Sequence, residues 1–98
     1  MAFKDTYNFD LLKNDAEQLV LQELEIQLAE QGEDICLCEE CVLDMAGMAL
    51  NAVKPVYRFS LLGSLYAASA MHEPSYADSV HEAVKQAIAK VKANPSHD

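Results

Sequence analysis

Apolar residues recur at helical spacing along most of the chain. The pattern predicts four helices, over residues 10–31, 39–53, 61–72 and 76–92. The first is rich in Leu, Glu and Gln, which are all good helix formers. The last carries the clearest apolar stripe, made of Val80, Val84, Ala87, Ile88 and Val91. The expected fold is therefore all-α, a compact small domain of about four helices.

Several of the helix ends have their own sequence signals. Gly32 follows the first predicted helix, and Pro55 ends the second because the residue before a proline avoids the helical conformation. Ser75 and Asp78 predict a capping box at the start of the last helix. Residues 56–60 are β-prone and are expected to be extended, although no second strand is evident to pair with them.

Two of the predicted helices have unusually broad apolar surfaces. Over residues 39–53 the polar positions fall on one narrow line, so this helix should be central to the core. The face of the first helix comprises Leu12, Ala16, Leu19, Val20, Leu24 and Ile26, flanked by Leu21 and Leu28. Such a wide face predicts contacts on two sides, either with a partner subunit or with two neighbours in the same chain.

Length and charge limit the classes of function. The 98 residues fit a single domain over residues 1–98, and 51% of them are hydrophobic. The net charge of −9 argues against direct nucleic-acid binding and against a basic membrane-binding patch. The N-terminus does not resemble a secretory signal, and the longest uncharged run, residues 59–71, is shorter than the roughly 20 residues that span a bilayer. We therefore expect a cytoplasmic protein, without membrane contact and with reduced thiols.

Three cysteines form the sharpest chemical pattern. Cys36 and Cys38 lie on the approach to the second predicted helix and Cys41 on its first turn, so their sulfur atoms can converge. Thiolates repel one another unless a cation holds them, and Zn²⁺ takes four tetrahedral ligands with Zn–S distances of about 2.3 Å. The spacing predicts a zinc site. Buried inert thiols and a redox Cys-x-x-Cys remain alternatives, although the surrounding acids oppose thiolate formation.

The pattern leaves the fourth zinc ligand open. Asp44 follows Cys41 by three residues and so lies beside it on the helix surface. His72, His81 and His97 could reach the site through the fold. Water or a group from a second chain would also complete the shell.

Motifs of the common enzyme classes are missing. The chain has no GxGxxG, P-loop, HExxH or GxSxG sequence. Six of its sixteen acidic residues are spread along the first predicted helix, which is typical of a solvated face. We therefore expect no enzyme activity.

Four blocks of sequence carry a family resemblance. They are residues 17–20 (EQLV), 34–46 (DICLCEECVLDMA) with 49–51 (ALN), 54–57 (KPVY) with Gly63 and 65–67 (LYA), and 94–97 (NPSH). In these blocks the sequence resembles the ComFB family of late competence development proteins. The block that contains the cysteines is the specific part.

The resemblance implies an all-helical, zinc-binding homodimer without enzyme activity. It places zinc ligation on Cys36, Cys38 and Cys41 and implies an accessory role in natural competence, with an unknown protein partner in the competence machinery. Some relatives are associated with cyclic dinucleotide signalling. Arg58 beside Tyr57 is the candidate contact for such a ligand, because Arg stacks on bases and pairs with phosphates. A surface position on an extended connector is the simpler interpretation of this arginine.

Overall fold

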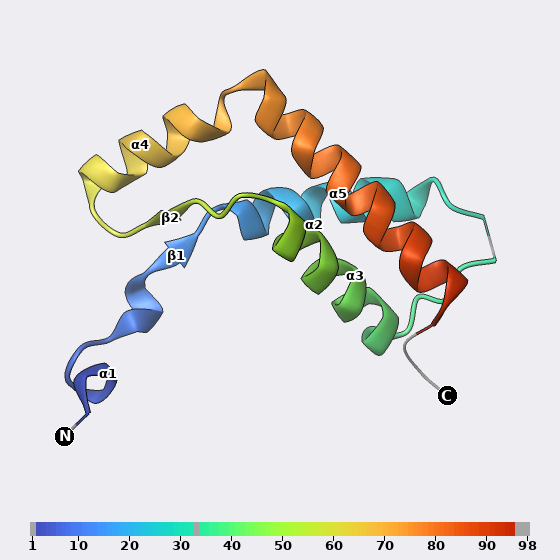
Figure 1. Cartoon of the computed structure of the whole chain (residues 1–98), viewed down its shortest axis with the longest axis horizontal. Helices are drawn as coiled ribbons and strands as arrows, with labels where there is room; N and C mark the ends of the chain where they lie inside the picture. Colours follow the sequence, from blue (N-terminus) through green and yellow to red (C-terminus); the bar gives the residue numbers. More distant parts are fainter. Residues whose placement is uncertain (1, 33, 96–98) are drawn as a thin grey trace.

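The protein is mostly helical in the computed structural model, which describes residues 2–32 and 34–95. The elements are α1 (Phe3–Thr6), the 3₁₀ turn η1 (Phe9–Leu11), β1 (Lys13–Asn14), α2 (Ala16–Ala29), α3 (Glu39–Ala52), β2 (Tyr57–Arg58), α4 (Leu61–Met71) and α5 (Pro74–Ala93) (Figure 1). The prediction of a helical fold is confirmed. None of the helices in the described ranges combines the length and the apolar character of a membrane span.

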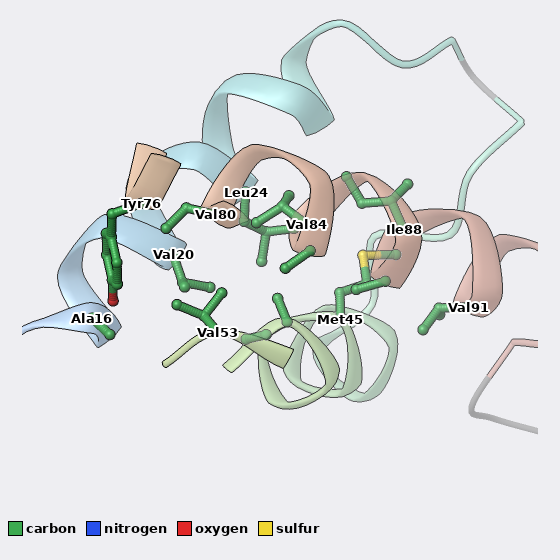
Figure 2. Close-up of a cluster of buried hydrophobic side chains, with 14 of the residues drawn as sticks. Ala16, Val20, Leu24, Met45, Val53, Tyr76, Val80, Val84, Ile88 and Val91 are labelled. Atoms are coloured by element: carbon green, nitrogen blue, oxygen red, sulfur yellow. The ribbon is translucent and has the colours of Figure 1, made fainter. Parts of the chain in front are cut away.

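The core lies where α5 packs against both α2 and α3. Figure 2 shows side chains of these three helices meeting, among them Val20 of α2, Met45 of α3 and Val84 of α5, each with 0% of its surface exposed. The Tyr76 hydroxyl at the start of α5 donates to the Lys54 carbonyl just after α3, at 2.8 Å. The two helices therefore run antiparallel. The apolar stripe predicted for the last helix is confirmed, since all five of its members are buried.

The prediction that α3 is central to the core is correct for one side of this helix. Cys41, Met45 and Ala49 have 0% exposure, whereas Leu43 is 62% and Met48 42% exposed. Two helices cannot cover the whole circumference of a third. The remaining apolar side of α3 faces outward in the single chain.

The first predicted helix begins six residues later than expected, at Ala16. Residues 13 and 14 instead pair antiparallel with β2, with Lys13 opposite Arg58 and Asn14 opposite Tyr57. The expectation that residues 56–60 lack a partner strand was therefore wrong. The partner lies more than forty residues earlier in the chain and is only two residues long, so no local pattern marks it.

α4 matches its predicted range, whereas the start of α5 differs from the prediction. Leu61 and Leu65 are 80% and 63% exposed, because α4 turns away from the core and buries only Ala67. The capping box at Ser75 is absent: α5 begins at Pro74, its N-cap is Glu73, and no side chain caps it. Proline is favoured at a first helical position, where its missing N–H would have no partner anyway.

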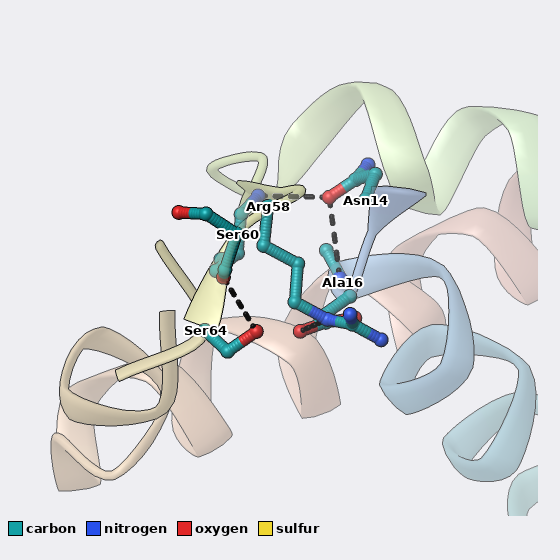
Figure 3. A network of polar contacts seen from close by, with 7 residues as sticks. Asn14, Ala16, Arg58, Ser60 and Ser64 are labelled. Carbon is teal, nitrogen blue, oxygen red and sulfur yellow. Dashed lines mark hydrogen bonds and ion pairs between the residues drawn. The ribbon is translucent and has the colours of Figure 1, made fainter. Parts of the chain in front are cut away.

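Asn14 joins the two short strands to the helix that follows. Its Oδ1 accepts the backbone N–H of Ala16 at 3.2 Å and that of Val56 at 2.8 Å (Figure 3). Beside it, the Arg58 Nε donates to both carboxylate oxygens of Asp15, at 2.7 and 2.9 Å. One amide oxygen therefore satisfies two backbone donors that are far apart in sequence.

Replacing Asn14 should destabilise the protein through these two donors. Asn14→Ala removes their shared acceptor and is expected to cost about 1–3 kcal/mol, measured by urea unfolding. Asn14→Asp keeps an acceptor at this position and should lose much less. Asn51→Ala, on the exposed side of α3, is the control and should not lower stability. Equal stability of the Asn14→Ala and Asn51→Ala proteins would contradict the assigned role.

Candidate metal centre

The structure brings the three cysteines together at the start of α3. Their Sγ atoms all lie within 4.8 Å of one another. Cys41 is completely buried, whereas Cys36 and Cys38 are half-buried at the edge of the body. The convergence expected from the spacing is therefore present in the fold.

The beginning of the helix fixes two of the three sulfur atoms. Cys38 is the N-cap of α3, with extended backbone, and its Sγ accepts the backbone N–H of Cys41 at 3.4 Å. The N–H of Val42 donates to the Cys38 carbonyl at 3.0 Å. A sulfur atom that receives an N–H at a helix N-terminus lies where negative charge is favoured. Cys36 approaches from the preceding loop, while neighbouring Ile35 packs against the core.

The donor set and its spacing fit a metal ion. Sulfur atoms bound to one tetrahedral Zn²⁺ lie about 3.8 Å apart, given Zn–S distances of about 2.3 Å. Sulfur atoms within 4.8 Å of one another need only small side-chain adjustments to reach that separation. Exposed Asp34, Glu39 and Glu40 surround the cluster and favour a cation there. The three cysteines could therefore hold a metal ion.

The candidates for a fourth ligand lie in different places. Asp44 is exposed on α3, one turn after Cys41. The His81 Nδ1 lies 2.9 Å from the Glu23 Oε2 between α5 and α2. His72 caps the C-terminus of α4, next to the end of α5 that bonds to Lys54. It thus lies at the far end of α3, whose 14 residues span about 21 Å.

His97 lies outside the described residues. Within residues 2–32 and 34–95, no carboxylate or imidazole joins the three sulfur atoms at the same spacing.

Arg58 and Tyr57 lie at the boundary between two surface cavities. Arg58 belongs to a cavity of about 780 Å³ whose walls also carry Asp10, Asp15 and Glu17. Because the Asp15 carboxylate binds the Arg58 guanidinium, this cavity offers little attraction to a phosphate. Tyr57 lines this cavity and also the other, of about 640 Å³.

The second cavity contains residues that the sequence analysis did not assign to a site. It lies between the chain after α3, α4 and the start of α5, and Lys54 and Tyr66 line it with Tyr57. Tyr76 lies in its wall, and burial raises the pKa of the Tyr76 hydroxyl above its usual 10.0. Lys54 and Tyr66 line the same cavity because α4 lies beside β2, and no local pattern predicts this arrangement.

Fold and site together define a class of small helical protein with a tri-cysteine cluster at the start of its central helix. The family of the late competence development protein ComFB matches residues 13–95, and the chain belongs to this family. The resemblance seen in the sequence is thereby confirmed.

A solved structure of the late competence protein ComFB from Bacillus subtilis shares the fold, with a TM-score of 0.68. The match covers 87% of this chain and 92% of that one, at 21% sequence identity. Among curated proteins no match was found.

Proposed function

We propose that the protein is a non-catalytic, zinc-binding accessory protein of natural competence that acts as a homodimer. The observation that carries the proposal is the gathering of three thiols within 4.8 Å at the start of α3. Membership of a family named for late competence development supports the biological role. Among the residues that the structure describes, the cluster consists of three sulfur donors, and such a donor set favours zinc over Mg²⁺ or Ca²⁺.

The proposed zinc has a structural role. Cys38 and Cys41 belong to the first turn of α3, and Cys36 would tie the preceding loop to them. Within that loop Asp34 and Leu37 are exposed, whereas Ile35 packs against the core. In zinc-finger peptides, metal binding supplies on the order of 10–16 kcal/mol, much of it spent on folding. In a chain this short, ligation would compensate for a thin core.

The amount of exposed surface supports a homodimer. The chain exposes 7174 Å², against roughly 5,500 Å² for a compact monomer of its mass. Its radius of gyration is 15.7 Å, whereas about 13 Å is typical of a domain of this length. The excess of roughly 1,600 Å² per chain is what an obligate dimer buries on each subunit.

The large exposed apolar side chains gather on the N-terminal arm, β2 and α4, which we term the arm–α4 surface. Phe3, Tyr7 and Phe9 on the arm form a cluster of rings with centroids 5.0–6.4 Å apart. Leu61 and Tyr66 on α4 are 80% and 71% exposed. In Figure 1 the arm and α4 project from the same side of the body. Exposed apolar side chains that gather in one region often mark a site of protein–protein contact, so this surface is the candidate interface.

A second candidate function, a cyclic dinucleotide receptor, has one observation in its favour. The cavity of about 640 Å³ presents the Lys54 ammonium together with the exposed rings of Tyr57 and Tyr66. Aromatic rings can stack on bases and an ammonium can pair with a phosphate. With Arg58 held by Asp15, Lys54 is the better candidate for the cation.

The metal proposal predicts a joint loss of zinc and stability in Cys38→Ser. Native mass spectrometry should detect zinc in the purified protein and none in the variant, whose melting temperature should fall by more than about 10 °C. Serine is itself a good N-cap, so the variant preserves the start of α3 and isolates the metal. Glu39→Gln, next to the cluster, should retain zinc and stability. The proposal would be refuted if freshly purified wild-type protein contained no zinc and melted at the same temperature as Cys38→Ser.

The dimer proposal predicts that Leu65→Asp on α4 dissociates the protein. Light scattering after size exclusion should give a dimer mass for the wild type and a monomer mass for the variant, since a buried charge without a partner is unfavourable. Leu43→Asp on α3 is the matched control, because Leu43 is 62% exposed and Leu65 63%. Dissociation of the control alone would place the interface elsewhere, and a monomeric wild type would exclude the dimer.

The receptor alternative predicts saturable heat when cyclic di-GMP or cyclic di-AMP is titrated into the protein. Lys54→Ala and Tyr66→Ala should each reduce the affinity at least about tenfold, whereas Lys85→Ala on α5 removes the same charge outside the cavity and should have no effect. Flat titration curves with both nucleotides would eliminate this candidate.

A further inference from the structure

We infer that α2 and the cysteine loop form a docking groove for a basic amphipathic helix of a partner protein. The inference rests on the proposed accessory role, because a protein without its own chemistry must act by contact. We term this surface the α2 groove. The inference gives both the surface through which the protein acts and the chemistry of the segment that binds there.

The α2 groove has almost entirely apolar walls and a volume of about 440 Å³. Leu21, Leu24 and Leu28 of α2 form one side, with Leu37 of the cysteine loop and Val42 of α3 opposite. Leu21 is 49% and Leu37 59% exposed, so both are accessible to a partner. Covering a leucine-lined groove of this kind with a partner removes apolar surface from water, which favours binding.

The spacing of the groove residues suits a helical occupant. The three leucines of α2 follow one another at i, i+3 and i+7 on one face; Leu24 is only 3% exposed, so Leu21 and half-buried Leu28 are the ones that a partner can contact. A partner helix with apolar residues at the same spacing can lay its own ridge beside this one, as in other helix-in-groove complexes.

The charge around the α2 groove indicates which polar residues the partner helix should carry beside its apolar stripe. Residues 14–53, which form α2, the cysteine loop and α3, contain ten Asp or Glu and no Lys or Arg, while the rest of the chain holds six acids and seven bases. Glu25 lies in the groove wall itself. A segment with Lys or Arg around its apolar stripe complements this surface and would be steered to it.

The same charge argues against a second copy of this chain in the α2 groove. In a symmetric dimer the same patch meets itself, so two strongly acidic surfaces would lie face to face. Like charges opposed across an interface are unfavourable. The arm–α4 surface carries the exposed aromatic residues and is the better site for self-association. The two surfaces therefore fit two different partners.

The test uses a synthetic amphipathic peptide of Leu and Lys at helical spacing, carrying a fluorescent label and titrated with the full chain in an anisotropy assay. Binding is expected, and Leu21→Asn and Leu37→Asn should each weaken it about tenfold through the lost apolar contact. Ile26→Asn is the matched control, since Ile26 is 55% exposed on α2 but does not line the groove. A Leu/Glu peptide of the same spacing should not bind.

Two results would overturn the inference. One is absence of binding by the Leu/Lys peptide. The other is equal binding to Leu21→Asn, Leu37→Asn and Ile26→Asn, which would mean general charge attraction without a groove. Native mass spectrometry of the same samples reports zinc and dimer mass independently. A variant that loses peptide binding but keeps its zinc and its dimer mass supports the groove and leaves the proposed function intact. A wild-type protein without zinc or without a dimer contradicts the proposed function and not the groove.

Discussion

The antiparallel contact between α3 and α5 is the interaction on which the rest of the structure depends. It buries Met45 against the stripe that includes Val84 and Val91, and α2 is held because it packs on both helices. Every other element is attached at the periphery. The cysteine loop leaves one end of α3, and the chain that leads through β2 to α4 leaves the other end. A domain of 98 residues has a small core, and its packing on the peripheral regions is limited: α4, for example, buries only Ala67.

The two peripheral regions differ in the kind of residue that could stabilise them. At the cysteine end, four acids lie close to only two large apolar residues, Ile35 and Leu37, and three thiols supply ligands that one ion could connect. At the opposite end, the arm and α4 are rich in exposed aromatic and leucine side chains, which gain most from covering by another apolar surface. Ligation suits a short segment with few hydrophobic residues, and association suits a segment with many. The distribution of residue types along the chain thus matches the two kinds of stabilisation that we propose.

Local sequence predicted the elements whose formation depends on near neighbours. The stripe of α5, the bounds of α3 and the meeting of the three cysteines all follow from spacing within a few turns. The errors arose where distant segments compete with helix propensity. Residues 13 and 14 leave the predicted helix because Asn14 and Asp15 find partners at Val56 and Arg58, which are more than forty positions away. The direction of α4 is equally non-local, so its exposed leucines and the cavity beside Tyr66 could not be predicted from spacing.

The cysteine loop links the metal proposal to the docking proposal. Leu37 lies between Cys36 and Cys38, so the backbone that carries one wall of the α2 groove is the backbone that the cluster would hold. Three thiolates with one Zn²⁺ carry a net charge of −1, so metal binding would leave the acidic character of residues 14–53 intact. It would therefore act on the groove through position and not through charge. If metal holds Leu37 in its docked position, it raises the affinity for the partner by some factor. Partner binding must then raise the affinity for the metal by the same factor, because coupling between two sites is reciprocal.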